Sequence, residues 1–146
     1  MKETAELRWS DAWLLAAIHQ CSKEKSADLV EILAAADLIN HAVLNVEELQ
    51  SGLFRLENAG LIQRAEAQQF SFQCTPEALA KIKLLLKKSK TALQLWKELE
   101  NSLAVVRWIP GEPVPHPANL HNYPGLTAAV YQDAVDHYLK RMRYAR

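Results

Sequence analysis

Apolar residues return at the period of an α-helix in five stretches of the chain. The first stretch begins after Ser10, and the others cover about 27–40, 46–59, 76–106 and 126–144. Each repeats apolar side chains three and four positions apart, the spacing that places them on one side of a helix. The fourth stretch has a possible break at residues 89–91. Its apolar positions are spaced like a short heptad seam, and they are Leu79, Ile82, Leu86, Leu93, Trp96 and Leu103.

The stretch over 46–59 has clear start and stop signals. Asn45 precedes it as a helix cap, and Glu48 stands three residues later, where its carboxylate reaches back to the cap amide. Gly60 follows it, at the position where helices often end in a left-handed residue. Likewise, we expect Ser26 to cap the helix that begins at Ala27. The inward stripe of the third helix is formed by Leu49, Leu53 and Leu56.

The segment between Leu61 and Cys74 predicts a short two-stranded hairpin. Residues 63–69 form its first strand and tip, and residues 70–74 alternate apolar and polar side chains, as a half-buried strand does. Thr75 then caps a new helix with Pro76 at its first position, where the missing N–H costs nothing.

This order of elements resembles the winged helix-turn-helix superfamily, in particular small bacterial regulators of the MarR and PadR type. The resemblance covers roughly the first two thirds of the chain. It rests on two groups of residues, Leu49, Gly52-Leu53, Leu56 and Ala59-Gly60-Leu61-Ile62, then Phe72 and Thr75-Pro76-Glu77-Ala78-Leu79. It implies a DNA-binding transcriptional regulator whose third helix enters the major groove.

The resulting fold class is mainly α with a small β-hairpin wing and a helical C-terminal extension. We expect a winged-helix domain over residues 8–88 and an extension over 89–146. Five of the six prolines fall within 109–125, which predicts a stiff, extended arm between the helices of the extension. The four tryptophans flank the hairpin region, and we expect them to anchor the core where helices meet; they are Trp9, Trp13, Trp96 and Trp108.

Composition narrows the function classes. Lysine and arginine number 17 and acids number 17, a balance with none of the excess positive charge typical of nucleic-acid binders. Cys21 and Cys74 are far apart and form no CxxC motif, which indicates thiols in a reducing compartment. The first residues lack the apolar core of a signal peptide, and no stretch reaches the roughly 20 apolar residues of a membrane span. We therefore expect a cytoplasmic protein.

Neither catalysis nor a cofactor is predicted. The five histidines are scattered without Cys, Asp or Glu at metal-ligand spacing, and there is no glycine-rich phosphate loop or nucleophile motif. Asp133, Asp136 and His137 lie at positions with the spacing of a solvent-facing helix side. The sequence thus predicts a protein that is not an enzyme and has no metal or cofactor.

The third helix carries the candidate DNA contacts. Placing its leucine stripe inward leaves Ser51, Arg55 and Asn58 facing outward, and Arg and Asn are the side chains that pair with guanine and adenine edges. The candidate DNA-binding residues are Asn45, Ser51, Arg55, Asn58, Arg64 and Gln68. Between Asp37 and Ala78, however, six acids stand against two bases. A winged-helix module that binds another protein is therefore the alternative function, with exposed Phe54 or the proline-rich arm as its contact.

Basic residues gather elsewhere in the chain. Lysines of the helix after the hairpin are either a solvated face or contacts to the DNA backbone; they are Lys81, Lys83, Lys87, Lys88 and Lys90. Apolar residues of the last two helices, beyond those a winged-helix core needs, predict a homodimer. The alternative is that these helices fold back onto Trp9 and Trp13 and leave a monomer.

Overall fold

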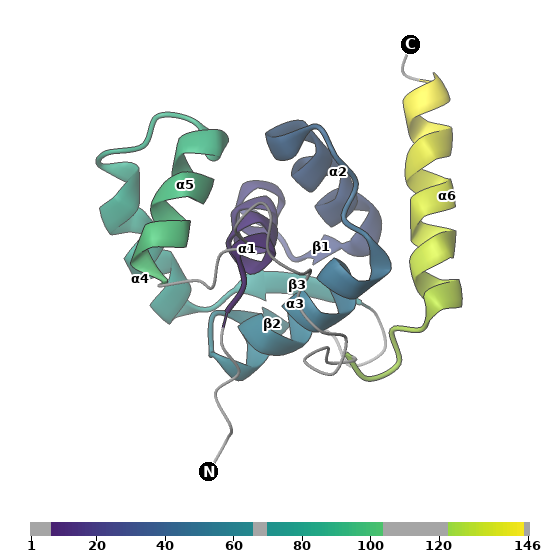
Figure 1. Cartoon of the computed structure of the whole chain (residues 1–146), viewed down its shortest axis with the longest axis horizontal. Coiled ribbons are helices and arrows are strands. Elements are labelled where there is room, and N and C mark those ends of the chain that lie inside the picture. Colours follow the sequence, from purple (N-terminus) through teal and green to yellow (C-terminus); the bar gives the residue numbers. More distant parts are fainter. Residues whose placement is uncertain (1–6, 66–69, 104–122, 145–146) are drawn as a thin grey trace, which may run out of the picture.

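The computed structural model describes residues 7–65, 70–103 and 123–144, and these form a mainly helical protein with a small antiparallel sheet (Figure 1). The elements in chain order are α1 Trp9–Cys21, β1 Ala27–Asp28, α2 Leu29–Asn40, α3 Val46–Asn58, β2 Ile62–Arg64, β3 Ser71–Cys74, α4 Pro76–Leu86, α5 Ala92–Ser102 and α6 Ala128–Tyr144. This confirms the coarse fold class, helices with a short β-hairpin between the third and fourth.

The sheet contains one strand more than the sequence predicted. Its order is β1-β3-β2, with both pairings antiparallel, and Ala27 of β1 faces Phe72 of β3. The expected helix start at Ala27 with Ser26 as its cap is therefore wrong. Asp28 caps α2 instead, because its Oδ1 accepts a hydrogen bond from the Glu31 amide at 2.8 Å. The chain before it pairs with β3, a contact that no local signal specifies.

The starts of α3 and α4 follow the predicted capping signals, whereas the first helix begins at Trp9 with Arg8 as its cap, so the start predicted after Ser10 is wrong. Asn45 caps α3 and Thr75 caps α4 with Pro76 at the first helical position. Gly60 has a φ of 76°, the left-handed conformation expected of a glycine that ends a helix. The helical stretch that begins at Pro76 is interrupted between Leu86 and Ala92, where the sequence allowed a break, and forms two helices, α4 and α5.

α1 is the central element of the core. Every residue from Ala12 to Ile18 is buried, because α2, α3, α5 and β3 all pack around this helix (Figure 1). Trp9, Trp13 and Trp96 form one aromatic cluster where α1 meets α5, with ring centroids 6.1–6.3 Å apart. The Trp13 indole N–H donates to the Ala36 carbonyl of α2 at 2.9 Å. Three tryptophans thus join helices as predicted, and Trp108 lies outside the described residues.

The last two helices pack on the body of the same chain. α5 covers α1, and its Leu99 is fully buried. α6 packs along α2, where the Tyr138 hydroxyl donates to the Asp37 carboxylate. Of the apolar residues that led to the predicted homodimer, Leu99 and Tyr138 are thus buried within one chain, and the others are half-buried against its core; they are Trp96, Leu103, Val130, Tyr131 and Val135. This packing removes part of the reason for expecting a second copy, and the homodimer stays a prediction. Residues 109–122 of the predicted proline-rich arm lie outside the described residues.

Candidate nucleic-acid interface on the third helix

α3 begins at a complete capping box. The Asn45 side-chain oxygen accepts from the Glu48 amide at 2.7 Å, and the Glu48 carboxylate accepts from the Asn45 amide at 3.0 Å. Burial raises the pKa of Glu48, while its hydrogen bond from the Asn45 amide acts in the opposite direction. Asn45, a predicted DNA contact, is exposed, but its side-chain oxygen is already used to start the helix.

Arg55 does not face outward. Its guanidinium is buried against α1, where Nε donates to Asp11 Oδ2 at 2.6 Å and a terminal nitrogen donates to Asp11 Oδ1 at 2.9 Å. Asp11 is fully buried and also accepts from the Arg8 amide at 2.7 Å. The prediction that Arg55 reads a base is therefore wrong, because its side chain is buried and two of its guanidinium nitrogens bond a carboxylate inside the core.

Ser51 is also buried, with 1% of its surface exposed, and the prediction that it faces outward is wrong. The neighbouring Gly52 lets α1 approach closely, since a Cβ at this position would lie 2.7 Å from Leu14 Cδ2. α3 is thus covered on two sides rather than one. Its buried residues are Leu49, Ser51, Gly52, Leu53, Arg55 and Leu56.

Two signals in the sequence point to this second buried side. Asp11 is the only charged residue in the run from Trp9 to Ile18, and it therefore required a partner of opposite charge inside the core. Gly52 in the middle of a helix costs about 1 kcal/mol relative to alanine, which is a sign of close packing. The leucine spacing alone could not reveal either.

The remaining predicted contacts are dispersed. Asn58 is half-buried at the end of α3 and takes part in an interaction within the chain. Arg64 is half-buried on β2, with its guanidinium carbon 4.5 Å from the centre of the Phe70 ring. Gln68 lies outside the described residues. The described site residues thus do not gather into one cationic surface.

The chain's own C-terminal segment lies against α3 and the hairpin. Gln50 of α3 donates to the Leu126 carbonyl, and Glu57 accepts from the Tyr123 hydroxyl at 3.0 Å. The Tyr123 ring packs edge-on against Phe72 of β3, with centroids 5.4 Å apart. The Tyr131 hydroxyl donates to the Leu44 carbonyl, just before α3, at 2.7 Å. Sequence reasoning missed these contacts because they join residues 51 or more positions apart.

The charge left on α3 is negative. Arg55 is its only basic residue, and Asp11 neutralises it. Glu47 is exposed, and Glu48 and Glu57 are half-buried. Duplex DNA presents one phosphate charge per about 1.7 Å of its axis, so an acidic helix entering the groove would be repelled.

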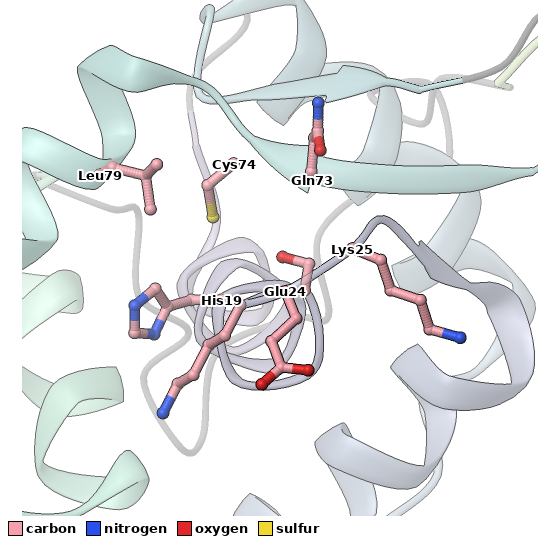
Figure 2. A pocket seen from close by; sticks show the side chains of 8 residues that line it. His19, Glu24, Lys25, Gln73, Cys74 and Leu79 are labelled. Carbon is pink, nitrogen blue, oxygen red and sulfur yellow. The ribbon is translucent and has the colours of Figure 1, made fainter.

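A second candidate site is a pocket of about 270 Å³ between the end of α1 and the start of α4 (Figure 2). His19, Cys74 and Leu79 line it, together with residues of the loop that contains Lys23 and Lys25. His19 Nδ1 is buried and has no hydrogen-bond partner among the residues that the structure describes. Burial, reinforced by Lys23, lowers the pKa of His19. Burial also raises the pKa of Cys74 to about 12, so its thiol stays protonated near neutral pH and is a poor nucleophile.

Among residues 7–65, 70–103 and 123–144, no three His, Cys, Asp or Glu side chains are grouped so that they could hold a metal ion. Asp133, Asp136 and His137 are exposed on α6, as their spacing predicted. Within the same ranges, no helix has the length and apolar character needed to cross a membrane. Compared with family models, curated proteins and solved structures, the chain has no significant match.

Proposed function

We propose that this chain is a winged-helix module that binds another protein and does not read DNA with its third helix. The observation that carries the proposal is the Asp11–Arg55 ion pair, which holds the only basic side chain of α3 inside the core. A base-reading helix needs long polar side chains that reach into the groove. Here Arg55 is unavailable and Gln50 is bonded to the Leu126 carbonyl.

The position of residues 123–131 supports the same proposal. This segment contacts α3 through Gln50 and Glu57 and contacts the hairpin through Phe72. In a winged helix that binds DNA, the third helix and the hairpin both approach the duplex. A segment packed against both elements narrows the surface that DNA could use.

The competing proposal is the DNA-binding regulator that the family resemblance implies. It would have to rely on Asn58 and Arg64, because Arg55 and Ser51 are buried. The two proposals differ in one measurable property, which is sequence-selective binding through α3.

Selection from a pool of random duplexes, followed by fluorescence anisotropy at low and high salt, tests the proposal. We expect no enriched sequence, and we expect Asn58→Ala to leave any residual, salt-sensitive binding unchanged. Enrichment of a defined site whose binding weakens by about 1–3 kcal/mol in Asn58→Ala would establish α3 as a reader and reject the proposal. Lys140→Ala, at an exposed position of α6, serves as a surface control.

A further inference from the structure

The hairpin of α4 and α5 carries an excess of positive charge, because its two helices and the turn between them contain six lysines against Glu77, Glu98 and Glu100. From Ala78 to Lys97 the chain contains six lysines and no acid, although the whole chain is neutral. Five of these lysines are exposed: Lys83, Lys87, Lys88, Lys90 and Lys97. Within the described part of the chain, none of them is held in an ion pair. The cations of this hairpin are therefore available to a partner.

Large apolar side chains are exposed on the same two helices. Leu84 is 63% exposed, and Leu79, Leu86 and Leu93 are 44–48% exposed. Each has a lysine three or four positions away on its own helix: Lys83 follows Leu79 by four and precedes Leu86 by three, Lys81 precedes Leu84 by three, and Lys97 follows Leu93 by four. Residues at these spacings are neighbours on a helix surface. The hairpin thus presents leucines bordered by cations.

We propose that this lysine–leucine surface of α4 and α5 docks an acidic amphipathic segment of a partner protein. The inference rests on the proposed function and names the chemistry of the partner. Carboxylates of such a segment would face the lysines, and its apolar side chains would cover the leucines, which removes apolar area from water.

The mixture of leucine and lysine distinguishes this partner from two others. A phosphate backbone offers charge but no apolar counterpart for Leu84 and Leu86. A membrane surface favours a helix whose apolar residues are collected on one side. On α4, Leu86 follows Leu79 by seven residues and shares its side, whereas Leu84 lies farther around the helix with Lys83 between them, so the leucines border the lysines on both sides. Leu79 also borders the pocket of Figure 2, which Lys23 and Lys25 line as well.

Fluorescence anisotropy with a labelled synthetic peptide tests the inference. The probe repeats Glu and Leu at helical spacing; one control peptide has Gln for every Glu, and another has Ser for every Leu. We expect the full-length chain to bind the Glu–Leu peptide and to bind each control peptide at least about tenfold more weakly. The Gln control loses the charge pairing with the lysines, and the Ser control loses the apolar contact with the leucines.

Two pairs of variants locate the binding surface. Lys83→Glu/Lys87→Glu should weaken peptide binding by about tenfold or more, because two attractions become repulsions. Lys140→Glu/Arg141→Glu makes the same charge change at two exposed positions of α6. It should change binding less than about twofold, because salt screens charges that are distant from the bound peptide. Leu84→Ser should weaken binding by about three- to tenfold, whereas Leu38→Ser, at a site 71% exposed on α2, should not.

The outcomes separate this inference from the proposed function. Peptide binding that is equal in the native chain and in Lys83→Glu/Lys87→Glu overturns the inference, as does a control peptide that binds as tightly as the Glu–Leu peptide. Random duplex DNA or phosphatidylserine vesicles that bind the native chain, and lose binding in that same variant, would reassign the surface to phosphate and also overturn it. If the chain binds none of these probes, the inference is rejected and the proposed function is not affected. DNA binding that depends on Asn58 would instead reject the proposed function.

Discussion

At the scale of single residues, Arg55 was expected to contact DNA, but its buried ion pair with Asp11 gives it a structural role. Arginine on a third helix suggests base recognition when only the helix itself is considered. In the structure both charges are nine-tenths or more buried and each satisfies the other. Removing one partner from such a pair leaves an uncompensated buried charge, which is far more costly than losing a surface contact.

We therefore expect Arg55→Met to destabilise the fold by about 3–5 kcal/mol in urea-induced unfolding. The double variant Asp11→Leu/Arg55→Met should recover most of this loss, because it removes both charges. Arg64→Met, a control at a half-buried position beside Phe70, should cost at most about 1 kcal/mol. Equal effects of Arg55→Met and Arg64→Met would contradict the buried-pair interpretation.

Gly52 gives a second test at this scale. A methyl group there would lie 2.7 Å from Leu14 Cδ2 and 3.1 Å from Asp11 Oδ1. Although alanine is the better helix former, we expect Gly52→Ala to destabilise the fold by about 1–3 kcal/mol through overpacking between α1 and α3. Thermal unfolding followed by circular dichroism measures this, and an unchanged or higher Tm would show that the two helices separate at little cost.

At the scale of elements, the end of α3 is fixed by backbone conformation. Gly60 has a φ of 76°, and a Cβ there would meet only Glu77 Oε2, at 3.5 Å. The cost of a side chain is therefore conformational rather than steric, and we expect Gly60→Val to destabilise by about 1–2 kcal/mol. Gly60→Asn should cost less, since asparagine tolerates the left-handed region. Chemical denaturation of both variants checks the order, and equal losses would contradict it.

The elements also show which parts of the fold a single sequence can predict. The start of α3 at Asn45 and the start of α4 at Thr75 were predictable because capping involves residues only three positions apart. β1 was not, because its only support is pairing with Phe72 and Ser71. The buried side of α3 that holds Ser51 and Arg55 was also not predicted, because it too depends on a contact between residues far apart in the sequence. It depends on α1, and the leucine stripe describes only the contact with the rest of the core.

At the scale of the whole molecule, two tyrosines join the C-terminal part to the body, each through a carboxylate. Tyr138 of α6 donates to Asp37, and Tyr123 donates to Glu57. Burial, followed by the hydrogen bond to the carboxylate, raises the pKa of each tyrosine to about 12. The neutral phenol is thus favoured in the folded state, since a phenolate would be buried beside a negative charge.

The sign of the resulting pH dependence follows from linkage. An unfolded tyrosine has a pKa of about 10, so the stabilisation is complete below that pH and is lost as pH rises toward about 12. We expect the free energy of unfolding to fall across this alkaline window and to fall less steeply in Tyr138→Phe. Urea titrations at several alkaline pH values measure both slopes. Parallel curves for the native chain and the variant would show that Tyr138 does not contribute.

The packing of α5 and α6 also bears on assembly. Trp96 and Leu99 pack against α1, and Tyr138 is 5% exposed against α2, so these side chains do not need a second copy of the chain. Among the described residues, the large apolar side chains that remain exposed lie in two places: Leu79, Leu84, Leu86 and Leu93 on the lysine-rich hairpin, and Leu38, Leu139 and Met142 on α2 and α6. Two hairpins of the same charge would repel each other across a two-fold axis. We therefore expect light scattering at micromolar concentration to give a mass near 16.5 kDa. A mass near twice that value, lost in Leu38→Ser but kept in Leu84→Ser, would instead place a dimer contact on the side of α2 and α6.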